Sequence, residues 1–90
     1  MSALPEATAG KGGTPAAVLA YLASQIVEDQ AAIRIDVEET GSGLTLRLHV
    51  APDDMGKVIG KRGRVAQSIR TVVRAAGARD GVNVNVDIVD

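Results

Sequence analysis

The sequence contains no cysteine, which excludes disulfides, thiolate metal sites and cysteine nucleophiles in this chain. It has a single histidine, and one imidazole cannot build a histidine-based metal site. Phenylalanine and tryptophan are absent and there is one tyrosine, so a hydrophobic core has to be aliphatic. We therefore expect a folded chain with no bound metal.

Long hydrophobic runs are also absent, because no stretch of roughly 18 apolar residues occurs to span a bilayer. The N-terminal residues lack the basic region and apolar core of a signal peptide, so we expect no membrane association and a cytoplasmic protein. Residues 1–13 contain few large apolar side chains and end in a glycine-rich run, which predicts a flexible leader. Residues 14–90 have the length of one domain.

The spacing of apolar residues predicts three helices and three strands. We expect helices over residues 14–28, 52–59 and 64–77, and strands over residues 33–38, 44–50 and 82–88. Residues 40–43 suit a hairpin turn, so the first two strands are predicted to be antiparallel. Gly77 is expected to end the last helix, whose apolar face is Val65, Ala66, Ile69, Val72, Val73 and Ala76. This order predicts a two-layer α+β sandwich with a three-stranded, antiparallel or mixed sheet.

The charges are unevenly distributed along the chain. Seven of the ten lysine and arginine residues lie in the stretch 57–79, which contains no acid. That stretch carries a formal charge of +7 and the remainder −8, although the total is −1. The polar face of the last predicted helix carries Arg64, Gln67, Arg70, Thr71 and Arg74. Such a face suits a polyanionic partner, although a plain solvated helix face is the alternative.

A short turn, Gly60-Lys61-Arg62-Gly63, joins the last two predicted helices. Its glycines allow a sharp bend and close approach of a ligand, and the following helix presents free N–H groups there. Together with the two cations these features suit a phosphate group, although a helical corner with glycines for geometry alone is the alternative. P-loop and dinucleotide-binding motifs are absent, so we expect no cofactor and no small-molecule substrate.

Residues 58–64, VIGKRGR, resemble the V-I-G-K-x-G core of the KH domain, an RNA-binding module. Residues 54–57 and 66–73 resemble the small single-domain bacterial KH proteins of the KhpA type, and the resemblance extends from about Pro15 to the C-terminus. The expected element order matches the type II KH topology, α-β-β-α-α-β. The resemblance implies a non-enzymatic protein that binds single-stranded RNA, with roughly four nucleotides clamped on the G-x-x-G loop.

The candidate RNA-binding site has eight residues in and around the turn, namely Gly60, Lys61, Arg62, Gly63, Lys57, Arg64, Val58 and Ile59. The two glycines would let the RNA backbone approach, and the cations between them would meet its phosphates. Lys57 and Arg64 would flank this contact. Val58 and Ile59, with one face of the second strand, would line an aliphatic groove for the bases, which implies loose sequence preference because aromatic stacking is missing.

The resemblance also implies protein partners, either a second copy in a homodimer or a larger KhpB-type KH-domain protein in a heterodimer. It implies an RNA chaperone role in post-transcriptional regulation, with links to cell shape. The alternative function is an interaction or dimerisation module that binds RNA only with the larger partner. A small nuclease using Asp53, Asp54 and His49 is disfavoured, because the two acids suit helix capping and His49 lies on the polar face of a strand. We expect no catalytic residues.

Overall fold

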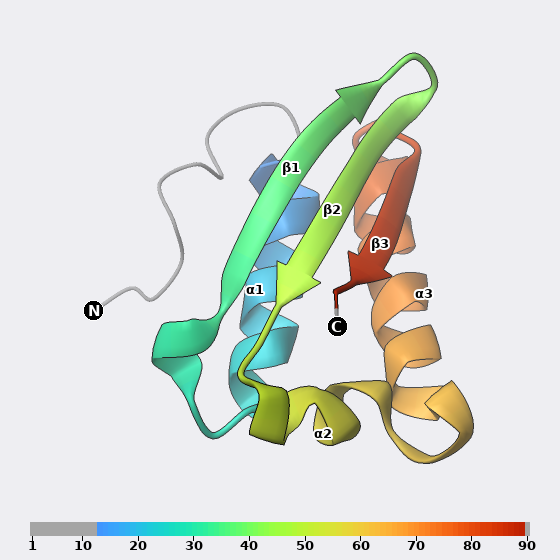
Figure 1. Cartoon of the computed structure of the whole chain (residues 1–90). Helices are drawn as coiled ribbons and strands as arrows, with labels where there is room; N and C mark the ends of the chain where they lie inside the picture. The colour runs from blue at the N-terminus through green and yellow to red at the C-terminus, as the bar shows by residue number, and fades with distance from the viewer. Residues whose placement is uncertain (1–12, 90) are drawn as a thin grey trace.

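The computed structural model describes residues 13–89, which form a three-stranded sheet and three α-helices (Figure 1). Its elements are α1 (Gly13–Ile26), η2 (Gln30–Ala32), β1 (Arg34–Thr40), β2 (Gly43–His49), η3 (Pro52–Asp54), α2 (Met55–Ile59), η4 (Lys61–Gly63), α3 (Arg64–Arg79) and β3 (Val84–Ile88). The η elements are short 3-10 helices. The predicted α+β class and the α-β-β-α-α-β order are confirmed. The predicted leader lies outside the described residues, apart from Gly13.

The sheet is mixed, with β2 in the centre between β1 and β3. β1 and β2 form the predicted antiparallel hairpin, which pairs Arg34 with His49 at one end and Thr40 with Gly43 at the other. The Gly43 N–H donates to Thr40 Oγ1 at 3.1 Å and helps to close the turn. β3 runs parallel to β2, so the chain has to cross over between them, and α2 and α3 form that crossover.

The core lies between the sheet and the helices α1 and α3, which cover one face of the sheet (Figure 1). The alternating residues Leu44, Leu46 and Leu48 of β2 are buried on that face, as their spacing predicts. The cluster around Leu46 and Leu48 contains Ala16, Leu19, Ala23, Val27, Val58, Ile69, Val73, Val84 and Val86. All of these side chains are aliphatic, which confirms the expectation drawn from the missing aromatic residues.

The end of α3 differs from the prediction, because the expectation that Gly77 ends this helix was wrong. The helix continues to Arg79, and the left-handed glycine that follows it is Gly81, with a φ of 72°. Gly77 is buried, and a Cβ at this position would lie 2.8 Å from the Val82 carbonyl oxygen and 2.5 Å from Val84 Cγ2. The glycine therefore allows α3 to pack closely on β3, which periodicity alone does not distinguish from a helix end.

Candidate nucleic-acid interface

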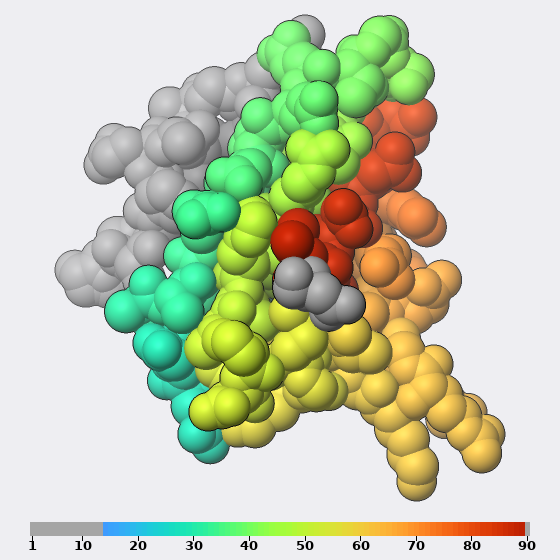
Figure 2. Space-filling view, viewed as in Figure 1, coloured from blue at the N-terminus to red at the C-terminus, as the bar shows by residue number. Residues whose placement is uncertain are grey.

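The turn predicted to bind phosphate lies between α2 and α3, at the end of the molecule opposite the β1–β2 turn (Figure 1). The Gly60 N–H donates to the Gly56 carbonyl at 2.8 Å and ends α2. The Gly63 N–H then donates to the Gly60 carbonyl at 3.1 Å and closes the turn. In the space-filling view, the segment that leads into α3 projects from the lower right of the surface (Figure 2). The turn is thus accessible to a large ligand.

Gly60 and Gly63 both have positive φ angles, of 76° and 74°, but the two positions differ in their surroundings. A Cβ on Gly60 would collide with the side chain of Val65, whereas a Cβ on Gly63 would meet no heavy atom within 4 Å. Gly60 is therefore required for the packing of α2 against α3. Gly63 leaves open space in which a ligand can approach the backbone.

Arg62, between the two glycines, also adopts the left-handed conformation, with a φ of 58°. Among residues 13–89 it is the only non-glycine residue with a positive φ. This conformation costs about 1–2 kcal/mol for a residue with a Cβ. Strained backbone is common at binding sites, where the surrounding structure holds it in place. The left-handed residue thus lies at the centre of the turn, between the two left-handed glycines.

The cations Lys61, Arg62 and Arg64 are exposed and surround a shallow hollow of about 210 Å³. Among the described residues, no carboxylate lies within 4 Å of any of them. The N-terminal end of α3 adds the positive end of its helix dipole at the same point. This end of the molecule therefore carries positive charge that nearby acids do not neutralise.

Lys57, which is predicted to flank the phosphate contact, has acidic partners instead. Its Nζ lies 2.9 Å from Glu28 Oε2 and 3.7 Å from Asp54 Oδ1. The hydrogen bond to Glu28 and the charges of both acids raise the pKa of Lys57. Lys57 thus joins the start of α2 to the segment after α1, and its charge is largely balanced within the protein.

Asp54 is the one buried charged residue in the described part of the chain, with 3% of its surface exposed. Its Oδ2 accepts a hydrogen bond of 3.0 Å from the Asp29 backbone N–H, which lowers the pKa of Asp54. Asp54 occupies the N-cap position of α2, but its side chain makes no capping hydrogen bond, so the predicted capping role was wrong. The carboxylate instead fixes α2, and with it the turn, to the segment that follows α1.

The residues predicted to form a base groove fall in different environments. Val58 is fully buried in the core, whereas Ile59 is 37% exposed beside the turn. The leucine face of β2 is buried beneath the helices, and its other face carries Arg47 and His49. Of the predicted groove residues, Ile59 is thus the one that presents apolar surface next to the cations.

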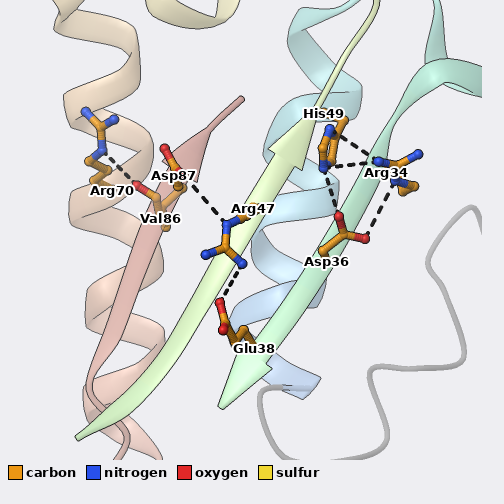
Figure 3. A network of polar contacts seen from close by, with 8 residues as sticks. All are labelled: Arg34, Asp36, Glu38, Arg47, His49, Arg70, Val86 and Asp87. Atoms are coloured by element: carbon orange, nitrogen blue, oxygen red, sulfur yellow. Dashed lines mark hydrogen bonds and ion pairs between the residues drawn. The ribbon is translucent and has the colours of Figure 1, made fainter. Parts of the chain in front are cut away.

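The outer face of the sheet also carries cations, but here acids accompany them (Figure 3). Arg47 lies 2.6 Å from Glu38, and Arg34 Nε lies 3.6 Å from Asp36 Oδ1. Residues Asp53, Asp54 and His49 do not form a metal site, because no group of three potential ligands occurs within residues 13–89. No helix in that part of the chain is long and apolar enough to cross a membrane.

Sequence reasoning missed two features of α3. Arg70, placed on the polar face that suits a polyanionic partner, donates from Nε to the Val86 carbonyl oxygen of β3 at 3.1 Å (Figure 3). Val72, assigned to the core, is 46% exposed and lines an open hollow of about 500 Å³ with Arg64, Gln67, Ser68 and Thr71. Both depend on how far α3 is rotated against the sheet, and a helical repeat of apolar residues defines that rotation only approximately.

Comparison with known proteins agrees with this arrangement. A family model described as "KhpA/KhpB, KH domain" matches residues 16–88. The RNA-binding protein KhpA of Halalkalibacterium halodurans is 41% identical over 70 residues, which cover 78% of this chain and 92% of that protein. The KhpA proteins of Caldanaerobacter subterraneus (76% and 91% covered) and Mycobacterium tuberculosis (78% and 84% covered) are also 41% identical. The chain therefore belongs to the KhpA/KhpB family of KH-domain proteins.

Proposed function

We propose that this chain is a non-enzymatic protein that binds single-stranded RNA through the turn of residues 60–63. The observation that carries the proposal is the set of three exposed cations, Lys61, Arg62 and Arg64, which lack acidic partners among the described residues. They surround an open stretch of backbone at Gly63. The relatives are named RNA-binding proteins, which favours RNA among the possible polyanions.

In this proposal, the RNA backbone lies across the turn. Lys61, Arg62 and Arg64 contact phosphates, while Gly63 leaves room for the sugar–phosphate chain to come close to the protein backbone. Ile59 provides apolar surface for an adjacent ribose or base. Lys57 holds α2 in position through its acidic partners and does not supply a phosphate contact of its own.

Three phosphate contacts predict a specific dependence on salt. Each neutralised phosphate of a single strand contributes about −0.7 to the slope of log K against log salt, so we expect a slope of roughly −2. Binding that rests on phosphates distinguishes poorly between sequences, because every nucleotide carries the same charge.

The test is the binding of fluorescent single-stranded RNA across a salt series. We would compare the wild type with the double variant Lys61→Asp/Arg62→Asp. A control variant, Arg34→Asp/Arg79→Asp, makes the same change in net charge at two exposed residues away from the turn. Circular dichroism establishes that each variant folds.

We expect the turn variant to lose binding by at least about 25-fold near 0.1 M salt, from two lost phosphate contacts. The control should lose much less. Equal losses in the two variants would show that net charge alone drives binding and would contradict a site at the turn. Binding by neither the wild type nor the variants would favour the second function below.

The second candidate function is a dimerisation module that binds RNA only together with a larger KhpB-type partner or a second copy. The exposed apolar side chains of the helical layer favour it, because Tyr21 is 56% and Val72 46% exposed. Val72 also lines the open hollow on α3. Under this function, Val72→Asp would abolish association with the partner and the isolated wild type would bind RNA weakly. Strong RNA binding by a monomer would contradict it.

We further propose that the protein acts as an RNA chaperone in post-transcriptional regulation in the cytoplasm, with consequences for cell shape. A site that grips the backbone suits a chaperone, because it accepts many RNA sequences. The supporting result would be faster annealing of two complementary RNA strands with the wild type than with Lys61→Asp/Arg62→Asp. Equal annealing rates would contradict a chaperone role.

A further inference from the structure

The outer edge of β3 carries backbone groups that do not pair with β2. The Leu44 N–H donates to the Asn83 carbonyl, and the Val89 N–H donates to the Leu48 carbonyl, so positions 83 and 89 face β2. Since the groups of a strand alternate in direction, Val84, Val86 and Ile88 turn their N–H and C=O groups away from β2. This edge of the sheet therefore offers donors and acceptors on the side where α3 passes.

Arg70 of α3 lies at this edge, where its Nε donates to the Val86 carbonyl at 3.1 Å (Figure 3). The side chain is half-buried, and in the described residues no carboxylate lies within 4 Å of it. A guanidinium has five N–H donors in one plane, so the bond from Nε leaves the two terminal nitrogens with four. The bond to β3 thus fixes the plane of the guanidinium and leaves its fork of donors available.

Arg70 lies on the same face of α3 as the turn, about two helical turns away. Arg70 follows Gly63 by seven residues, which is about two helical turns, so both lie on one face of α3. The rise of 1.5 Å per residue separates them by about 10 Å along the helix axis. An RNA strand clamped at Gly63 and running along α3 brings one of its bases to Arg70.

We propose that Arg70 is a specificity-determining residue that binds one base of the RNA and favours guanine or cytosine there. This inference rests on the proposed function. A fork of two donors matches two adjacent acceptors, which guanine presents at O6 and N7 and cytosine at O2 and N3. Adenine has the N6 amino donor beside N1 and N7 and an isolated acceptor at N3, and uracil has the N3–H donor between O2 and O4, so neither base presents two adjacent acceptors to the fork.

The test uses single-stranded RNAs of adenine that carry one guanine or one cytosine at successive positions. We expect the wild type to bind the best of these about tenfold more tightly than the all-adenine strand. Arg70→Lys keeps the charge but lacks the fork, and Arg70→Gln lacks both. Both variants should lose this preference, and Arg70→Lys should retain the affinity for the all-adenine strand. Arg79→Lys, at the far end of α3, is the control and should keep the preference.

The outcomes separate this inference from the function on which it rests. A wild type that binds RNA without a preference for guanine or cytosine would overturn the inference alone. So would an Arg70→Lys variant that weakens all strands by the same factor, because a purely structural or phosphate-binding role acts uniformly. A folded wild type that binds none of these RNAs would overturn the proposed function, and the inference with it. Thermal unfolding of each variant excludes loss of fold as the cause.

Discussion

The basic stretch of the chain contains two kinds of cation that the sequence does not distinguish. Lys61, Arg62 and Arg64, the free set, are exposed without acidic partners among the described residues, as are Arg74 and Arg79 further along α3. Lys57 and Arg70, the held set, are bound by acceptors on other elements. Each residue of either set contributes the same +1 to the formal charge. The difference shows that the charge available to a ligand depends on contacts with distant parts of the chain.

The acceptors explain this division. Lys57 is held by Glu28 and Asp54, which lie after α1 and before α2, and Arg70 is held by a carbonyl of β3. The free set lies in the turn and at the first residue of α3, and the connection between α2 and α3 lies at the end of the molecule opposite the β1–β2 turn (Figure 1). The turn thus leaves its cations available to a ligand. The charge of Lys57 is balanced within the protein, whereas Arg70 has its Nε bound to β3 and keeps four terminal N–H donors.

The largest predicted loss of stability comes from a substitution in the turn that carries the free set. Gly60→Ala forces a Cβ into the left-handed conformation, which costs about 1–2 kcal/mol, and into the side chain of Val65, which costs about 1–3 kcal/mol. We expect the free energy of unfolding to fall by about 2–5 kcal/mol in a urea titration. Gly63→Ala, where space is open, should cost only the conformational part. Equal losses in the two variants would contradict the packing role of Gly60.

The contact that holds Arg70 depends on the close approach of α3 and β3. Gly77→Ala places a methyl group 2.8 Å from the Val82 carbonyl oxygen and 2.5 Å from Val84, which predicts a loss of about 1–3 kcal/mol in unfolding free energy. Because the turn is remote from this contact, RNA binding measured well below the unfolding temperature should keep its salt slope. A variant as stable as the wild type would show that the two elements can separate without cost.

The fold was largely predictable because its signals are local. Alternating leucines define β2, a repeat of apolar residues defines α3, and Gly60 with Gly63 marks the turn. The division into free and held cations was not predictable, because it depends on contacts between distant residues. The hydrogen bond from the Asp29 N–H to Asp54 joins positions 25 residues apart, and that from Arg70 to Val86 joins positions 16 apart.

The pH dependence of stability tests the contact between Asp54, a partner of Lys57, and the Asp29 N–H. The hydrogen bond from the Asp29 N–H lowers the pKa of Asp54, so the native state is stabilised when this carboxylate is ionised. This stabilisation is fully present above the unfolded pKa of about 4 and is lost as the pH falls through the lower pKa of the native state. Asp54→Asn should therefore lower the Tm at pH 7, and the difference from the wild type should shrink in acid. A difference that stays constant with pH would contradict this role.

The smallest predicted effect tests the central claim most directly. We would measure the salt slope of RNA binding for Lys57→Ala and Lys61→Ala, which remove one lysine each from the held and the free set. The slope should become shallower by about 0.7 in Lys61→Ala and stay parallel to the wild type in Lys57→Ala. Equal changes in the two variants, or a change in Lys57→Ala alone, would contradict the claim that Lys61 is available to bind phosphate and that Lys57 is not.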